Sequence, residues 1–217
     1  MPPESNVCGV LLAGGQSRRM GGGDKCLLEI GGTTLLQRIA DTAAAQTDPL
    51  VLNTNSAPSL FEEYGLPVAP DVVDGFAGPL AGVLTGLEWA AANAPGCDWV
   101  ASFACDAPFA PRDLVVRLLA AIENEGAEMA CASSNGRDHP VFALWPTRLA
   151  PALREAVVEE GLRKVDIWTA RYRLTKVEFP PGSGTAAGDP FFNINRPEDL
   201  DTAAALLATG RDDQLRR

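Results

Sequence analysis

Residues 11–25 read LLAGGQSRRMGGGDK and connect two apolar runs, residues 7–12 and 26–30. The loop holds five glycines, two arginines and Lys25. Glycine lets the backbone turn at little steric cost and approach a ligand closely, and successive backbone N–H groups in such a turn form an anion site. Arginine and lysine add charge-assisted hydrogen-bond donors. The loop therefore indicates a binding site for a polyphosphate.

Two better-known phosphate-binding motifs do not fit this loop. A P-loop needs Gly-Lys-Ser or Gly-Lys-Thr at the start of a helix, whereas Lys25 lies between Asp24 and Cys26 and leads into a strand-like run. The dinucleotide fingerprint needs Gly-x-Gly-x-x-Gly, and the loop lacks this spacing. A mobile surface loop would explain the glycines, but not their position after the first buried strand, where open α/β sheets bind ligands.

The composition limits the class of protein and its partners. The 217 residues, 46% hydrophobic and 21% charged, fit one globular domain that spans residues 1–217. The net charge of −10 argues against nucleic acid or an anionic membrane as a general partner. The five cysteines are odd in number and include no C-x-x-C pair, which indicates neither a disulfide framework nor a zinc site. We find no basic leader and no apolar run of membrane-spanning length, so we expect a cytoplasmic protein.

Short apolar runs alternate with longer amphipathic ones, which predicts an α/β fold with a mostly parallel central sheet. The expected strands are residues 7–12, 50–54, 66–69, 99–103, 127–133, 141–145 and 174–179. The expected helices are residues 33–46, 58–64, 79–93, 111–125, a segment from beyond Pro146 to about Glu160, 164–171 and 197–208. Asn135-Gly136 is a turn signal between two strands. Residues 189–195 are expected to be extended, and residues 210–217 to be frayed.

The signature loop of molybdenum cofactor guanylyltransferases resembles the run Leu12-Ala13-Gly14-Gly15-x-Ser17-x-Arg19-Met20-Gly21-x-x-Asp24-Lys25. Three further motifs of that family match in the same order, namely Gly78-Pro79-Leu80-Ala81-Gly82, Cys105-Asp106-Ala107-Pro108 and Asn193-Ile194-Asn195-Arg196-Pro197. The resemblance implies a Rossmann-like three-layer α/β/α nucleotidyltransferase fold. We expect a nucleotide-binding half at about residues 7–110 and an acceptor-binding half at about residues 111–208.

Asp106 is the strongest candidate for a metal ligand. It follows the expected strand 99–103, and a carboxylate at a strand end can hold Mg²⁺, which takes one or two carboxylates together with phosphate oxygens. An N-cap role fits less well, because the next helix is expected to begin five residues later, near Pro111. In the resembling family the Cys-Asp-x-Pro motif carries the magnesium-binding aspartate, and the resemblance assigns that role to Asp106.

Three more residues are candidates for the nucleotide site. From the residues alone, Asp71 is an ordinary turn aspartate, and Asn53 fits equally well as a turn residue or as a contact to a base or ribose. Gly82 lies in a helix start, where free N–H groups favour anions or small residues allow close packing on the sheet. The resemblance places all three in the nucleotide site. It assigns further nucleotide contacts to Leu12, Ala13, Gly14, Gly15 and Lys25.

The last motif carries two candidates for contact with the acceptor. Asn193 and Asn195 alternate along an extended stretch, so they could share one face and contact the acceptor. Asn195 could equally cap the helix that begins at Pro197. His139 is the single histidine, which argues against a histidine metal site and leaves a structural or substrate-side hydrogen bond.

The resemblance implies transfer of GMP from magnesium-bound GTP to the terminal phosphate of molybdopterin, with release of pyrophosphate. Such a reaction needs no side-chain nucleophile, because positioning and charge neutralisation provide most of the catalysis. Arg19 and Lys25 are expected to stabilise charge on the phosphates. Molybdoenzymes or cofactor-insertion proteins are the expected transient partners. The alternatives are a cytidylyltransferase acting on the same cofactor, a sugar-1-phosphate nucleotidyltransferase and a non-catalytic molybdenum cofactor carrier.

Overall fold

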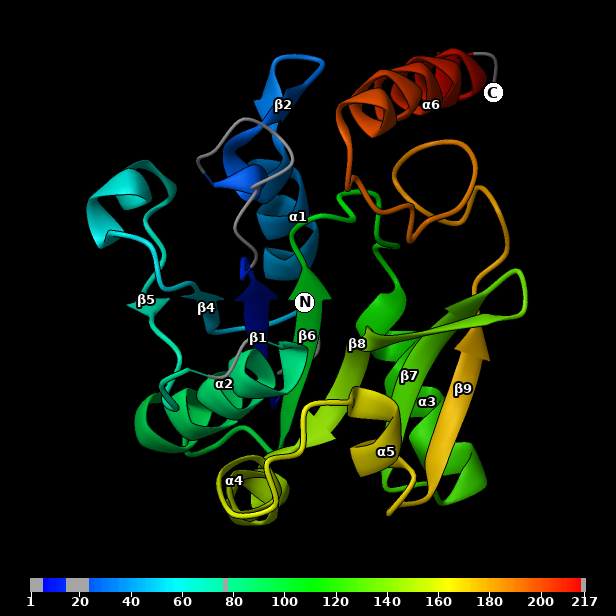
Figure 1. Cartoon of the computed structure of the whole chain (residues 1–217). Coiled ribbons are helices and arrows are strands. Elements are labelled where there is room, and N and C mark those ends of the chain that lie inside the picture. The colour runs from blue at the N-terminus through cyan, green and yellow to red at the C-terminus, as the bar shows by residue number, and fades with distance from the viewer. Residues whose placement is uncertain (1–5, 15–23, 76–77, 216–217) are drawn as a thin grey trace.

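The computed structural model describes residues 6–14, 24–75 and 78–215, with side chains only as far as residue 209. Its core is a seven-stranded sheet with strand order β5-β4-β1-β6-β8-β7-β9 (Figure 1). The strands are β1 (Val7–Leu12), β4 (Leu50–Asn53), β5 (Val68–Ala69), β6 (Trp99–Ala104), β7 (Met129–Ser134), β8 (Arg137–Pro146) and β9 (Leu174–Glu178). Strand β8 runs antiparallel to its neighbours β6 and β7, and the other neighbouring pairs are parallel. The expectation of a mostly parallel sheet is confirmed.

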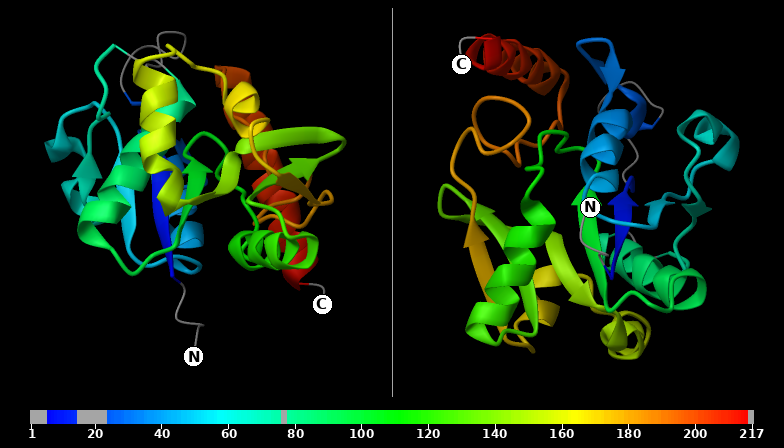
Figure 2. Two further views of the ribbon diagram at one scale, coloured as in Figure 1. Left: turned by 90° about the horizontal axis from the view of Figure 1, so that it is seen from below. Right: turned by 180° about the vertical axis from the view of Figure 1, so that it is seen from behind.

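Helices cover both faces of this sheet, which gives the three layers expected from the sequence (Figure 2). They are α1 (Leu35–Ala44), α2 (Pro79–Asn93), α3 (Leu114–Glu125), α4 (Ala150–Val158), α5 (Val165–Thr169) and α6 (Pro197–Leu215). Helices α1 and α3 pack on one face, and α2, α4 and α5 pack on the other. Helix α6 lies beyond the carboxyl ends of the central strands (Figure 1).

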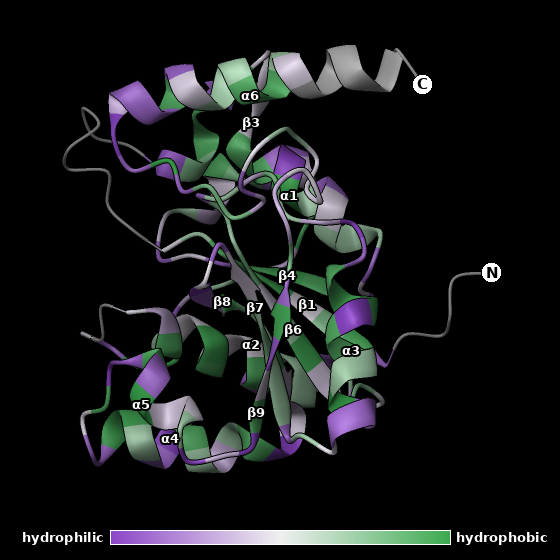
Figure 3. Cartoon of the chain, turned by 90° about the vertical axis from the view of Figure 1, so that its right-hand side faces the viewer, coloured by the Kyte–Doolittle hydropathy of each residue, from purple (hydrophilic) through white to green (hydrophobic). Residues whose placement is uncertain are grey.

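Burial explains why the central strands are apolar along their whole length. All six residues of β1 are buried or nearly so, because helices cover both faces of a parallel sheet. Figure 3 shows hydrophobic residues concentrated along these strands. The five cysteines are free thiols, and Cys8, Cys26, Cys105 and Cys131 are buried. Burial raises the pKa of Cys8 and of Cys26 to about 12, so these two thiols behave as core residues.

Local sequence signals account for several element boundaries. Thr34 caps helix α1, since its Oγ1 accepts a hydrogen bond of 3.1 Å from the backbone N–H of Gln37. Asn135 and Gly136 both adopt positive φ, 50° and 72°, as a two-residue hairpin turn of type I′ requires. The predicted hairpin between β7 and β8 is therefore confirmed.

Several expected elements differ from the observed ones. The run 26–30 is a 3₁₀ turn, Lys25–Leu27, followed by the short strand β2 (Glu29–Ile30), which pairs with β3 (Thr33–Thr34) outside the main sheet. The expected helix at 58–64 consists of two 3₁₀ turns, Pro58–Leu60 and Glu62–Tyr64. Helix α6 continues to Leu215, whereas the sequence predicted an end at residue 208 and fraying from residue 210. No helix of the described residues is long and apolar enough to cross a membrane.

Candidate active site

The central strands β1 and β6 end side by side at the edge of the sheet where ligands are expected. Strand β1 pairs with β4 on one side and with β6 on the other, so the strand order reverses beside β1. In open α/β sheets, ligands bind outside the carboxyl ends of the strands at this reversal. Leu12, the last residue of β1, is in register with Asn53 of β4 and Ala104 of β6. The segments that follow these three strands therefore begin side by side.

Lys25 and Asp106 meet at this edge. The Nζ atom of Lys25 lies 2.9 Å from Oδ2 of Asp106 and donates a second hydrogen bond of 2.8 Å to Oδ1 of Asn195. The side chains of Lys25 and Asp106 are 15% and 36% exposed. Three segments that are far apart in the sequence thus bring an ammonium, a carboxylate and an amide together.

The ion pair between Lys25 and Asp106 contributes too little to the free energy of unfolding to explain why these residues are present. A partly exposed pair of this kind contributes about 0–1 kcal/mol. Asp106 also does not cap the next helix, because α3 begins at Leu114 with Asp113 in the N-cap position. Breaking the ion pair therefore costs little free energy, and each of the two groups can bind a ligand instead of the other, as a binding site requires.

The donors of this site suit a hard cation. Asp106 offers carboxylate oxygens and Asn195 an amide oxygen, whereas zinc sites are built from thiolates and imidazoles. Within residues 6–14, 24–75 and 78–209, no group of three His, Cys, Asp or Glu side chains could hold a metal ion. A single carboxylate fits Mg²⁺, since this ion is held by one or two carboxylates together with the phosphates of a ligand.

Asn53 and Asp71 form a second polar group at the end of β4. Asn53 is buried, and its Nδ2 donates to the backbone oxygen of Ala69 at 3.2 Å and to Oδ1 of Asp71 at 2.9 Å. Asn55 donates to the other carboxylate oxygen of Asp71 at 2.9 Å and accepts from the Asp71 backbone N–H at 2.8 Å. Two side-chain amides thus hold the Asp71 carboxylate in one orientation. An ordinary turn aspartate does not need this number of hydrogen bonds.

Gly82 lies on the first turns of α2, directly against this group. A Cβ atom at Gly82 would lie 2.4 Å from Oδ1 of Asn53 and 2.8 Å from Cδ2 of Leu12. The glycine therefore allows the helix to pack closely on the ends of β1 and β4, as the packing alternative from the sequence expected. Direct contact between Gly82 and a nucleotide stays a prediction.

We expect Gly82→Ala to destabilise the protein and to disturb Asn53. Overpacking a filled site costs about 1–3 kcal/mol, and one kcal/mol shifts the Tm of a domain of this size by roughly 2–4 °C. Gly96→Ala is the matched control, because a Cβ there would meet no atom within 4 Å. Thermal unfolding by circular dichroism measures both variants. An unchanged Tm in Gly82→Ala would contradict the close packing described here.

The acceptor-side segment differs in detail from its expected form. Residues 192–195 form no strand, so Asn193 and Asn195 do not share a strand face. Asn195 does not cap α6 with its side chain, which accepts from Lys25 instead. The cap comes from Asp199, whose Oδ2 accepts the backbone N–H groups of Asn195 at 2.7 Å and Arg196 at 2.8 Å. Asp199 therefore caps the helix, and the side chain of Asn195 is left to contact Lys25.

His139 is buried in the hairpin of β7 and β8, and the described residues include no group of three metal-ligating side chains that it could belong to. Its Nε2 lies 2.8 Å from Oγ of Ser134, which donates to Oδ1 of Asp189 at 2.8 Å. This is the structural hydrogen bond that the sequence left as one of two options. Burial lowers the pKa of His139 below its usual 6.5, although Asp189 opposes the shift.

This lowered pKa predicts a loss of stability on acidification. The folded protein binds a proton at His139 less readily than the unfolded chain does, so the free energy of unfolding falls as the pH drops below about 6.5. The charged residues that act on the ring, Asp189, Asp138, Glu178 and Arg137, are the same in both proteins compared. We therefore expect His139→Gln to lose less stability than the wild type between about pH 7 and pH 5. Urea unfolding at each pH measures the difference, and equal losses in both proteins would refute the assignment to His139.

Some site candidates lie outside the described residues, and others were not foreseen. Gly15 and Arg19 belong to the undescribed residues 15–23. Ala13 and Gly14 directly follow β1, and the backbone N–H of Ala13 donates to the oxygen of Asn53. Sequence reasoning preferred Asn53 to Asn55 and missed Ser56, whose Oγ donates to Oδ1 of Asp24 at 2.6 Å. The polar run 53–56 after an apolar strand was the available signal.

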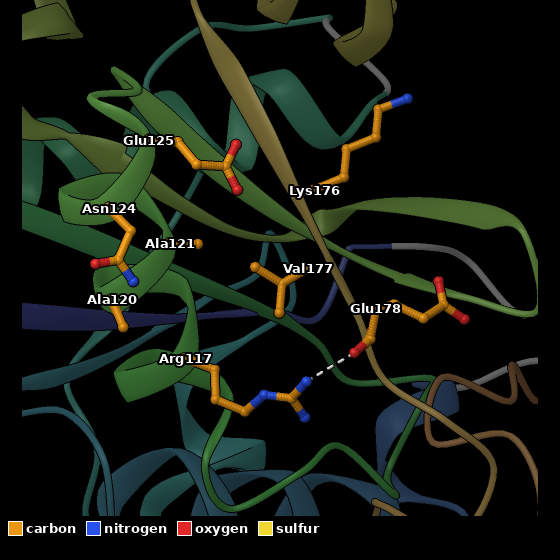
Figure 4. A pocket seen from close by; sticks show the side chains of 8 residues that line it. All are labelled: Arg117, Ala120, Ala121, Asn124, Glu125, Lys176, Val177 and Glu178. Carbon is orange, nitrogen blue, oxygen red and sulfur yellow. Dashed lines mark hydrogen bonds between the residues drawn. The ribbon is translucent and has the colours of Figure 1, made fainter.

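A pocket of 410 Å³ lies elsewhere, between α3 and the edge strand β9 (Figure 4). Its walls carry mixed charges, with Arg117 and Lys176 near Glu125 and Glu178. Arg117 donates to the backbone oxygen of Glu178 at 2.7 Å and stacks on the Phe179 ring. The pocket contains neither Lys25 nor Asp106, so it is separate from the site at the strand ends.

Comparison with known proteins identifies one family. The family model for the MobA-like NTP transferase domain matches residues 9–172. The molybdenum cofactor guanylyltransferase of Bradyrhizobium sp. strain ORS 278 is 52% identical over 202 residues, which cover 93% of each chain. The matched region includes Lys25, Asp71 and Asp106.

Solved structures show the same fold at lower identity. Molybdopterin-guanine dinucleotide biosynthesis protein A from Archaeoglobus fulgidus superposes with a TM-score of 0.70 at 21% identity, covering 93% of this chain and 99% of its own. A protein of Mycobacterium tuberculosis, crystallised in complex with manganese, gives a TM-score of 0.62 at 19% identity, with coverage of 92% and 98%. These similarities concern the fold of the chain.

Proposed function

Because the chain belongs to the family of MobA-like NTP transferase domains, we propose that it transfers GMP from GTP to the phosphate of molybdenum-molybdopterin. The products are the guanine dinucleotide form of the molybdenum cofactor and pyrophosphate. The relative that is 52% identical is named a molybdenum cofactor guanylyltransferase and matches over nearly its whole length. The observation that carries the proposal is the contact of Lys25 with both Asp106 and Asn195 at the strand ends.

The residues of the site fit a reaction that proceeds by positioning and charge neutralisation. An oxygen of the acceptor phosphate attacks the α-phosphorus of GTP, and the bond to the β-phosphate oxygen breaks to release pyrophosphate. Asp106 would hold Mg²⁺, which supplies neutralisation of the phosphate charge when it is bound. The ammonium of Lys25, no longer needed by Asp106, would then donate to the phosphates, together with Arg19. No side chain has to act as nucleophile.

The divalent cation is supported by two observations. The donors near Asp106 are hard oxygens, which Mg²⁺ prefers. The Mycobacterium tuberculosis protein of the same fold was crystallised in complex with manganese, another divalent ion that oxygen donors bind. We assign Asp106 as the metal ligand of this chain.

The remaining assignments divide the chain into two halves. In the half of residues 7–110, we assign nucleotide contacts to Leu12, Ala13, Gly14, Gly15, Lys25, Asn53, Asp71 and Gly82. In the half of residues 111–208, we assign acceptor contacts to Asn193 and Asn195. The oriented carboxylate of Asp71 suits a group with paired N–H donors such as the edge of guanine. We expect the reaction to take place in the cytoplasm, with transient docking on molybdoenzymes that receive the product.

Pyrophosphate release by the purified protein tests this proposal. The reaction contains Mg²⁺, molybdenum-loaded molybdopterin and GTP, CTP or ATP in parallel. We expect turnover with GTP and little with the other two. Turnover with CTP would instead identify a cytidylyltransferase, and binding without pyrophosphate release would identify a carrier. Turnover with hexose 1-phosphates as acceptors would identify a sugar nucleotidyltransferase.

A further inference from the structure

The segment from Asp189 to Asp199 carries the two asparagines assigned to the acceptor, although it belongs to no strand. An irregular segment needs anchors if its side chains are to keep a fixed position. Three sets of hydrogen bonds provide them, at the beginning, in the middle and at the end of the segment. The first of these has no explanation in the proposed reaction.

The anchor at the beginning is Asp189. Its Oδ1 accepts from Oγ of Ser134 at 2.8 Å and from the backbone N–H of Phe191 at 2.9 Å. Ser134 is fully buried and in turn meets Nε2 of His139 at 2.8 Å. The ring of Phe191 stacks on His139, with the centroids 4.6 Å apart. Two residues of the β7–β8 hairpin thus fix the start of the segment.

The proton positions in this anchor follow from the number of donors. A serine hydroxyl has one proton, and Ser134 gives it to Asp189. The His139 nitrogen facing Ser134 must therefore carry a proton and donate to Oγ. The bonds run in one direction, from His139 through Ser134 to the carboxylate of Asp189. Removal of one member leaves its buried neighbour without a hydrogen-bond partner, so the members of such a chain depend on one another.

The other two anchors connect the segment to the active site. The backbone N–H of Ile194 donates to the backbone oxygen of Asp106 at 2.8 Å. Asn195 then reaches Lys25 with its side chain, and Asp199 accepts the backbone N–H groups of Asn195 and Arg196. The position of Asn195 beside Lys25 depends on the path of the chain from Asp189.

We propose that His139, Ser134 and Asp189 are positioning residues that hold the Asn193–Asn195 segment against Lys25 and Asp106. They act through the segment and touch neither of the two charged groups. The alternative is a role confined to the stability of the hairpin. The neighbouring serine separates these possibilities, because Oγ of Ser133 bonds to Glu178 at 2.8 Å on the other side of β7. Ser133→Ala is therefore a matched control for Ser134→Ala.

The lysines of the chain provide a readout that does not depend on activity. The sequence contains only Lys25, Lys164 and Lys176. Lys25 is mostly shielded by its contacts with Asp106 and Asn195, whereas Lys164 is exposed and lies outside the hairpin. The rate of acetylation of Lys25 by acetic anhydride, relative to Lys164, can be measured by mass spectrometry. It reports whether Asn195 remains in place.

We expect Ser134→Ala and Asp189→Asn to raise the relative acetylation rate of Lys25 several-fold, and Ser133→Ala to leave it unchanged. His139→Gln keeps an N–H donor toward Ser134 and is expected to retain more of the protection than His139→Phe. Protection of Lys25 in folded Ser134→Ala and Asp189→Asn would overturn the proposal. Equal loss of protection in Ser133→Ala would overturn it as well. Asp189→Asn, a change of nearly equal size, decides the question if Ser134→Ala fails to fold.

A kinetic measurement, which rests on the proposed function, gives a second readout. Loss of one buried hydrogen bond is expected to raise the KM for molybdopterin in Ser134→Ala about tenfold, with little change in the KM for GTP. A purely structural role would change both constants together or neither. If the wild type releases no pyrophosphate, the proposed function fails, while the acetylation of Lys25 still decides the positioning role.

Discussion

Asp106→Asn is expected to lower the kcat of pyrophosphate release by roughly 10²–10³-fold, the loss that follows removal of one preorganised electrostatic group. The amide has nearly the shape of the carboxylate but no charge to hold a divalent cation. The fold should remain intact, because the ion pair with Lys25 is partly exposed and such pairs contribute about 0–1 kcal/mol. Pyrophosphate release and thermal unfolding measure the two effects.

A second ion pair of the same composition supplies the control. Lys176 Nζ lies 2.7 Å from Oδ2 of Asp138, with side chains 55% and 45% exposed, and joins strands β9 and β8. Asp138→Asn should leave both kcat and Tm nearly unchanged. If Asp106→Asn were as active as Asp138→Asn, Asp106 could not be the metal ligand. If raising the Mg²⁺ concentration restored part of the activity of Asp106→Asn, the defect would lie in metal affinity.

The fold was predictable where the apolar pattern was long and continuous. Strands β1, β4 and β6 and helix α2 were expected within a residue or so, because parallel strands are buried on both faces and give unbroken apolar runs. Prediction failed at residues 26–30 and 58–64, where the elements are short. In the first, Ile30 packs with Leu35 and with Leu207 of the last helix. A contact so distant in sequence leaves no local pattern.

The contacts of the candidate site were also predictable in part. The meeting of Lys25 and Asp106 was expected, since Lys25 ends the loop that follows the first strand, Asp106 follows another strand, and the carboxyl ends of parallel strands share an edge. The contact of Lys25 with Asn195 was not expected, because it depends on how the irregular segment after Asp189 returns to that edge. The capping of α6 by Asp199 was missed for a different reason: the sequence pointed to Asn195, just before the helix, as the N-cap. Asp199 is the third residue of α6, and its carboxylate reaches back to the backbone N–H groups of Asn195 and Arg196, as the acidic residue of a capping box does.

The negative net charge of the chain makes substitution of Lys25 a more demanding test of the proposed function than substitution of Asp106. A protein with a net charge of −10 repels a triphosphate at long range, so the local cations near the strand ends must outweigh that field. We expect Lys25→Ala to lower kcat by roughly 10²–10³-fold and to raise the KM for GTP. Removal of the ammonium also leaves the Asp106 carboxylate without its partner, which adds repulsion toward the phosphates. Pyrophosphate release at saturating and limiting GTP separates the two constants.

Two companion variants make the result of Lys25→Ala specific. Lys176→Ala removes a lysine from an equivalent ion pair and is expected to keep full activity. Lys25→Arg retains the charge but replaces a compact ammonium by a planar fork, and we expect it to recover only part of the rate. Normal kcat in Lys25→Ala would exclude Lys25 from the reaction, whatever its contact with Asp106.

The double variant Lys25→Ala/Asp106→Asn examines whether the two residues work as one unit. Residues that act together are strongly non-additive, as the loss of one already disables the other. If Lys25 and Asp106 stabilise the same phosphate charge, the double variant should lose hardly more activity than the worse single variant. Independent roles would instead multiply the two losses to roughly 10⁴–10⁶-fold. Multiplied losses would mean that the ion pair of the ligand-free protein does not mark a single catalytic unit.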